Sequence, residues 1–191
     1  MNIPAEFDDI RPYSPEELPQ VFEELLADPS FQAVLTNVIP GIPIEMLAAQ
    51  LHQCKTNLDV QKTFFYSLLH GIIDKHSDGF DMDTSSLDDK NRNYTFISNH
   101  RDIVLDPGFL SVGLIDNNFP TTVEIAIGDN LLIYPWIKKL VRVNKSFIVQ
   151  RALSMRQMLE SSARMSRYIH FAVTEKKENV WIAQREGRAK D

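Results

Sequence analysis

The chain has 191 residues, 43% of them hydrophobic and 24% charged. These values are typical of a soluble globular protein and exclude general disorder, a collagen-like repeat and a disulfide scaffold. The single cysteine, Cys54, can form neither an internal disulfide nor a cysteine-based metal site, and we expect it to be a buried small side chain. The acidic first ten residues do not resemble a signal peptide, and no apolar stretch reaches the roughly 18 residues of a membrane-spanning helix. We therefore expect a cytoplasmic protein whose membrane contact, if any, is peripheral.

Charge divides the chain into two unlike halves. Residues 1–95 hold 6 Lys and Arg against 16 Asp and Glu (net −10), residues 96–191 hold 14 against 10 (net +4), and the two sum to the overall −6. Residues 138–167 contain eight cations and the single acid Glu160. This density favours an anionic partner such as nucleic acid, a phosphorylated small molecule or anionic lipid headgroups, although a solvated basic face explains it equally well. The eight are Lys138, Lys139, Arg142, Lys145, Arg151, Arg156, Arg164 and Arg167.

Residues 1–77 are predicted to form a small helical bundle, because most of the expected helices open on a capping side chain or a first-turn proline. The first runs from the Ser14 cap to about residue 27, the second covers 28–38 and the third 43–54. A fourth starts at Asn57 and carries apolar side chains at helical spacing. These are Val60, Phe64, Leu68 and Ile72.

Residues 78–93 are polar and acidic, and we predict a linker or an exposed loop there. The DxDxS pattern at Asp81–Ser85 resembles the start of a calcium-binding loop. It lacks the central glycine and the terminal glutamate of an EF-hand, so we assign no metal site.

From Tyr94 the pattern changes to short apolar strands that alternate with helical stretches. Alternation of this kind predicts an α/β domain with a mostly parallel sheet covered on both faces, following the helical bundle. The expected strands are 94–98, 122–128, 146–149 and 179–184, and the expected helices are 106–117, 135–141 and 153–175.

A histidine and two carboxylates follow the first predicted strand, at the carboxyl end where ligand-binding groups gather in α/β sheets. His100 lies two residues beyond the strand, with Asp102 and Asp106 nearby. A carboxylate that holds one ring nitrogen leaves the other free to take a proton from a substrate hydroxyl. The alternative is a surface loop whose polar side chains only cap the next helix, since Asp106 is followed by a first-turn proline.

Two further strand ends carry polar groups. Arg151 follows the third strand, after a cationic and aromatic helix, and would lie beside His100 if those two strands were neighbours. A guanidinium suits bidentate capture of a phosphate. After the fourth strand come Glu186, which can position an acceptor hydroxyl, and Gly187, which permits close backbone approach.

Taken in order, these segments resemble the PlsC-like glycerol-phosphate and lysophospholipid acyltransferase superfamily. SNHRDIVLDP resembles the first family motif, GDNLLIYPWIKKLVRVNKSFIVQR the stretch leading into the second, and WIAQREGRAKD a form of the third. The resemblance implies that His100 is the catalytic base and Asp106 its orienting carboxylate. It also implies that Arg151 binds the acceptor phosphate, and that Glu186, Gly187 and Arg188 belong to the acceptor site.

The chain departs from the family pattern at three places. Five residues separate His100 from Asp106 instead of the usual four, so Asp102 is an alternative partner, although the proline after Asp106 favours that residue. Gln184-Arg185 replaces the aromatic-proline pair of the third motif and no threonine follows Gly187, which leaves open whether Arg185 or Arg188 faces the acceptor. The fourth motif would lie beyond residue 191, so we expect residues 94–191 to be the first part of a truncated catalytic domain.

The resemblance implies an O-acyltransferase that moves a fatty acyl group from acyl-CoA or acyl-carrier protein to a hydroxyl of glycerol phosphate, a lysophospholipid or a related lipid. Neither a cofactor nor a metal is needed. We expect peripheral binding to anionic lipid on the inner face of the cytoplasmic membrane, and no binding to nucleic acid. The alternatives are a non-catalytic module that binds anions, namely nucleic acid or acidic lipid, and an inactive relative. The role of residues 1–77 is expected to be packing.

Overall fold

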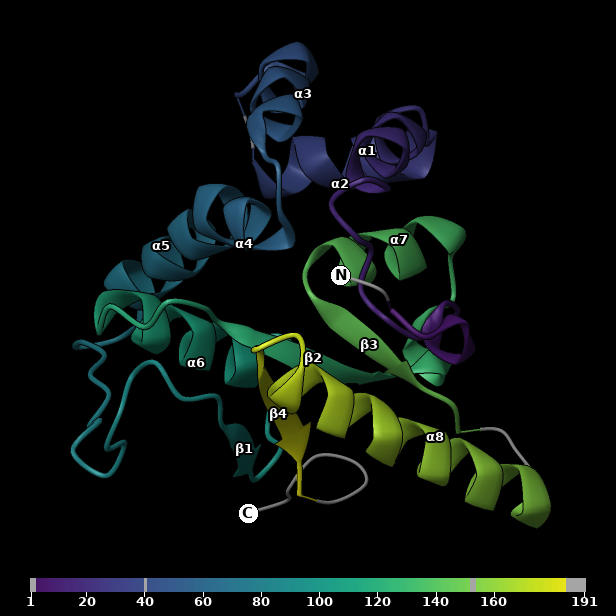
Figure 1. The fold of residues 1–191 in the computed structure, drawn as a ribbon. Helices are drawn as coiled ribbons and strands as arrows, with labels where there is room; N and C mark the ends of the chain where they lie inside the picture. Colours follow the sequence, from purple (N-terminus) through teal and green to yellow (C-terminus); the bar gives the residue numbers. More distant parts are fainter. Residues whose placement is uncertain (1–2, 40, 152–153, 185–191) are drawn as a thin grey trace.

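The computed structural model describes residues 3–39, 41–151 and 154–184, and it shows helices followed by a four-stranded parallel sheet with further helices on its faces (Figure 1). The α/β class predicted from the sequence is confirmed. None of the described helices is both long and apolar enough to cross a membrane.

The amino-terminal region contains the predicted helices, with shifted starts. Asp28 caps its helix by accepting from the N–H groups of Ser30 and Phe31, as expected. The last long helix is capped by Thr56, not by Asn57, whose side chain instead donates to a carbonyl of the sheet domain. The elements are η1 (Ala5–Phe7), α1 (Leu18–Leu26), α2 (Pro29–Val38), α3 (Ile44–Gln53), α4 (Asn57–Val60), the π-helical turn η2 (Gln61–Phe65) and α5 (Tyr66–His76).

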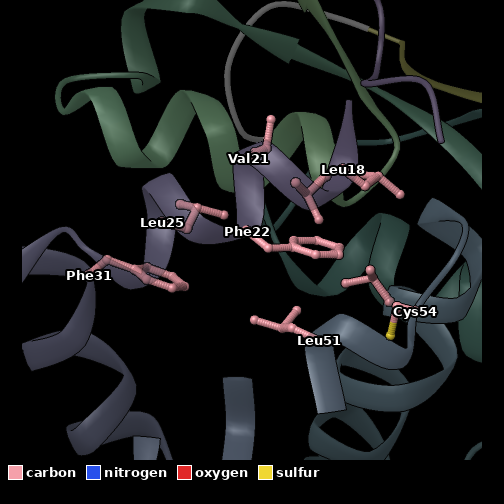
Figure 2. Close-up of a cluster of buried hydrophobic side chains, with 9 residues drawn as sticks. Leu18, Val21, Phe22, Leu25, Phe31, Leu51 and Cys54 are labelled. Atoms are coloured by element: carbon pink, nitrogen blue, oxygen red, sulfur yellow. The ribbon is translucent and has the colours of Figure 1, made fainter. Parts of the chain in front are cut away.

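Helices α1 to α4 enclose a hydrophobic cluster, part of which Figure 2 shows. Phe22 and Leu25 of α1 face Phe31 of α2 and Leu51 of α3. Cys54 lies in this cluster at 6% exposure, as predicted, and burial raises the pKa of its thiol. Val143 also belongs to the cluster, although it comes from a helix of the sheet domain, so the amino-terminal helices pack directly against that domain.

The sheet has the order β1-β4-β2-β3, with all strands parallel. Its strands are β1 (Thr95–Ser98), β2 (Val123–Gly128), β3 (Ser146–Val149) and β4 (Asn179–Ala183). The connecting helices are α6 (Leu105–Asp116), the 3-10 turn η3 (Asp129–Leu131), α7 (Pro135–Val143) and α8 (Met155–Thr174). Because every strand is parallel, the carboxyl ends of all four strands lie along the same side of the sheet, which we call its carboxyl edge.

Helices cover both faces of the sheet, as expected for parallel strands. On one face Leu114 of α6 packs with Ile125 and Trp181. On the other face Tyr168 of α8 packs with Phe147, and both side chains are fully buried. Residues 78–93, predicted to be a loop, form turns without helix or strand.

Many cations of the basic stretch are paired within the molecule. Three of them meet acids from the first 24 residues: Arg164 contacts Asp9, Arg167 contacts Glu6 and Lys139 contacts Glu24, with N to O distances of 2.9, 2.6 and 2.8 Å. The opposite charges of the two halves thus face each other across their junction. Surface pairs of this kind stabilise weakly one by one, but together they link the first 24 residues to the sheet domain.

Two further cations of the stretch are buried. The Arg142 guanidinium donates to the carbonyls of Arg11 and Asp8, at 2.7 and 2.8 Å, and stacks 4.0 Å from the Tyr13 ring centroid. Lys145 is 2% exposed, and its ammonium group lies 2.7 Å from a Glu178 carboxylate oxygen. These side chains hold the fold together and are not available to an anionic partner.

The Arg11 side chain continues this junction to the start of α1. It lies 2.6 Å from the Glu17 carboxylate, which also accepts the Ser14 N–H at 2.7 Å. Partial burial alone would raise the pKa of Glu17, but the hydrogen bonds from Arg11 and Ser14 outweigh it and lower the pKa to about 2. Glu17 is therefore ionised at neutral pH and contributes to stability in that form.

Candidate active site

His100 lies in the loop after β1, at the carboxyl edge of the sheet. Its Nδ1 is 3.1 Å from Oδ2 of Asp106, and the two side chains are 16% and 21% exposed. The ring packs against the Trp181 indole in a T-shaped arrangement, at a centroid distance of 5.9 Å. Trp181 Nε1 in turn donates to Ser98 Oγ at 3.0 Å, which fixes the indole under the loop. The strands β1 and β4 thus hold the histidine in place.

The two candidate carboxylates do different things. Asp106 Oδ2 accepts the N–H groups of Arg101 and Asp102, at 2.8 and 3.1 Å, in addition to its contact with His100. Asp102 Oδ1 accepts the N–H groups of Val104 and Leu105, both at 2.8 Å, and so caps the first turn of α6. The geometry therefore places Asp106 at His100 Nδ1 and gives Asp102 a backbone role.

This arrangement determines what the imidazole can do. A carboxylate at Nδ1 keeps the proton on that nitrogen while the ring is neutral, so Nε2 carries the lone pair. Two backbone N–H groups hold the carboxylate oxygen, and the Trp181 indole packs against the ring. The histidine is thus oriented as a proton acceptor at the edge of the sheet.

Arg151 lies two residues beyond β3, and its backbone N–H donates to Asp129 Oδ1 at 3.2 Å. Its side chain passes over Gly128, the last residue of β2. A Cβ on that glycine would lie 2.7 Å from Arg151 Nε and 2.5 Å from Asn130 Oδ1, both closer than ordinary contact. Sequence reasoning assigned Gly128 no role; the signal that could have found it is a glycine as the last residue of a strand.

His100 and Arg151 are at the same edge but not side by side. Their adjacency was expected only if β1 and β3 were neighbours, and these two strands are the outermost in the described sheet. Three strand spacings of about 4.8 Å put the two strand ends roughly 14 Å apart. The Arg151 side chain already reaches over the end of β2, so a ligand that contacts both side chains must extend across the end of β4.

The third motif begins between these two positions. Gln184 follows β4, and its N–H donates to the Ser98 carbonyl at 2.8 Å, which extends the pairing of β1 and β4 by one residue. The predicted acceptor-site residues Glu186, Gly187 and Arg188, with Arg185, lie outside the described part of the chain.

A search of the curated proteins finds no significant match. A scan against protein-family models matches the acyltransferase family over residues 81–189, which is more than half of the chain. The matched range contains all four strands and the loop that carries His100 and Asp106. The family resemblance indicated by the sequence motifs is thereby confirmed. The chain belongs to the acyltransferase family of PlsC-like domains.

Proposed function

We propose that this acyltransferase moves a fatty acyl group from the thioester of acyl-CoA or acyl-carrier protein to a hydroxyl of glycerol phosphate, a lysophospholipid or a related lipid. The observation that carries the proposal is the contact between His100 Nδ1 and Asp106 Oδ2 at the carboxyl end of β1. A base oriented in this way is what direct attack by a hydroxyl requires.

In the proposed reaction, Nε2 of His100 takes the proton of the acceptor hydroxyl while the hydroxyl oxygen attacks the thioester carbonyl carbon. The tetrahedral intermediate then collapses, the carbon–sulfur bond breaks, and the proton passes from the imidazolium to the departing thiolate. Asp106 supports the positive charge on the ring between the two transfers. The products are an ester and a free thiol, and neither a metal nor a redox cofactor takes part in these steps.

The acceptor is proposed to lie along the carboxyl edge of the sheet. Arg151 is proposed to bind its phosphate, because a guanidinium matches two phosphate oxygens in geometry and charge. Glu186, Gly187 and Arg188 are proposed to complete the acceptor site from the end of β4. Because the Arg151 side chain lies over the end of β2, an acceptor that reaches across the end of β4, such as a lysophospholipid, can contact both Arg151 and His100.

Peripheral attachment to the inner face of the cytoplasmic membrane remains part of the proposal, but with fewer cations than the sequence suggested. Lys145 and Arg142 are buried, and Lys139 pairs with Glu24. Lys138 is exposed and remains a candidate for contact with anionic headgroups. The internal pairing of the basic stretch also weakens the alternative of a dedicated anion-binding module.

The decisive experiment compares His100→Ala with the exposed-histidine control His76→Ala. Thiol release from an acyl thioester is followed in the presence of glycerol phosphate or a lysophospholipid, with product ester identified by mass spectrometry. We expect the first variant to lose about two to four decades in rate and the control to match wild type. Equal activity of both variants would contradict the role of His100, and a folded wild type without transfer to any acceptor would identify an inactive relative.

A further inference from the structure

Large apolar side chains are exposed in three segments that follow the carboxyl ends of β1, β2 and β3. Val104 is 63% exposed, Ile133 72%, Met155 80% and Leu159 70%. Because these strands are parallel, the segments share the edge that carries His100. We call this set the apolar rim. Its members are Ile103, Val104, Ile133, Tyr134, Met155, Met158 and Leu159.

Helix α8 shows how the rim arises. Tyr168 and Met165 lie on the stripe that packs against the sheet, and Met158 continues that stripe at helical spacing. One face of the last half of α8 packs on the sheet, whereas residues 154–160 are all exposed. In Figure 1 the amino end of α8 extends at the lower right, past the strand ends. The apolar stripe of α8 thus continues beyond the part of the helix that packs on the sheet.

A cation accompanies each part of the rim. Arg101 lies just before the loop of Ile103 and Val104, Lys138 is one turn beyond Tyr134, and Arg156 lies between the α8 methionines. All three are exposed. Arg156 pairs with Glu160 at 3.2 Å, but an ion pair this exposed is weak and can be exchanged for another anion. Apolar tips beside cations match the boundary between acyl chains and anionic headgroups.

We propose that the apolar rim is a membrane-docking surface, with Ile133, Tyr134 and the first two turns of α8 entering the headgroup boundary of a bilayer that contains anionic phospholipid. The inference rests on the proposed function, to which it adds an orientation. The rim and His100 share one edge of the sheet, so docking presents Nε2 to hydroxyl groups at headgroup depth. An amphipathic tyrosine and long cationic side chains are suited to this layer.

The test uses the whole chain and does not depend on turnover. Vesicles of phosphatidylcholine and phosphatidylglycerol in equal parts are mixed with protein, and bound protein is measured by flotation. We expect the combined variant Ile133→Ser, Met155→Ser and Leu159→Ser to bind about tenfold more weakly than wild type, because three apolar side chains no longer leave water on docking. Since all three are already exposed to solvent, its thermal midpoint should equal that of wild type.

A control variant removes three exposed apolar side chains from another face. Val34→Ser, Val38→Ser and Met46→Ser lie on α2 and α3, at 38%, 48% and 53% exposure, and in Figure 1 these helices are far from the amino end of α8. The control variant should bind vesicles as wild type does. Equal losses in both variants, undiminished binding of the rim variant, or a wild type that does not bind these vesicles would overturn the proposal.

Sedimentation without lipid tests whether the rim is instead an interface between copies of the chain. A wild type that self-associates through the rim and does not bind vesicles would identify a protein interface in place of the docking surface. His100→Ala should bind vesicles as wild type does, because the histidine is not a rim residue. If the rim binds vesicles but no thioester is released, the proposed function fails and the docking surface stands. If acyl transfer occurs but vesicle binding does not depend on the rim, the proposed function stands and the docking surface is refuted.

Discussion

The carboxylate beside the histidine supplies a graded test of the proposed dyad. In Asp106→Asn, the backbone N–H groups of Arg101 and Asp102 select the amide oxygen for the position of Oδ2, because an amide NH₂ there would face two donors. That oxygen still accepts from His100 Nδ1, so the tautomer is kept and only the negative charge is lost. Asp106→Ala removes both the acceptor and the charge.

The two variants should therefore differ strongly in rate. A hydrogen bond to a charged group contributes about 1.5–3 kcal/mol and a neutral one about 1 kcal/mol, so losing the charge alone costs about 0.5–2 kcal/mol. This corresponds to a decrease of about 2- to 30-fold in kcat/KM. In Asp106→Ala the ring is free to adopt either tautomer, and we expect a decrease of about 10³- to 10⁴-fold.

The assay is acceptor-dependent thiol release, with circular dichroism and the thermal midpoint reported for each variant. Asp102→Asn is the matched control, since an amide oxygen accepts from Val104 and Leu105 as the carboxylate does. Its kcat/KM should stay within about threefold of wild type. If Asp106→Asn is as inactive as Asp106→Ala, the two backbone donors do not select the amide orientation and this reasoning is wrong.

Three other variants test contacts elsewhere in the molecule. Lys145→Ala should lower the free energy of unfolding by about 2–4 kcal/mol in a urea titration, because Glu178 loses its buried partner but keeps 23% side-chain exposure. Gly128→Ala, at an ordinary φ of −71°, should displace Arg151 and raise the acceptor KM about tenfold with little change for the acyl donor; equal effects on both substrates would argue against an acceptor role for that arginine. Since the pKa of Glu17 falls from 4.5 to about 2 on folding, its stabilisation is fully present above pH 4.5, and the difference in thermal midpoint between wild type and Glu17→Gln should shrink as the pH falls towards 2.

Features set by neighbouring residues could be predicted from the sequence. The Asp28 cap and the alternation of strands with helices are local signals, and both are confirmed. The proximity of His100 and Asp106 is also local. Asp106 is only six positions after His100, and the start of α6 turns its side chain back towards the loop. Residues this close in the sequence can adopt few relative positions, so their contact can be predicted without knowledge of the rest of the fold.

Features set by distant partners could not be predicted. Strand order depends on how the connections cross the sheet, so the insertion of β4 and β2 between the strands that precede His100 and Arg151 could not be predicted from local patterns. The burial of Lys145 likewise depends on Glu178, 33 residues away. A cation within a basic stretch therefore looked like part of a binding surface, while the structure uses it to close the fold.

The position of β4 has a consequence for how the molecule is made. In the described sheet β1 pairs with β4, whose residues lie 85 positions later in the chain, as Thr95 and Val180 illustrate. Closing so long a loop is slow. Within the described sheet, β1 has no hydrogen-bonded partner strand until β4 pairs with it. During synthesis the histidine loop is made before β2, β3 and α8, whereas Trp181, the indole that packs against His100, follows all three. The contact between His100 and Trp181 therefore cannot form before β4 has been made.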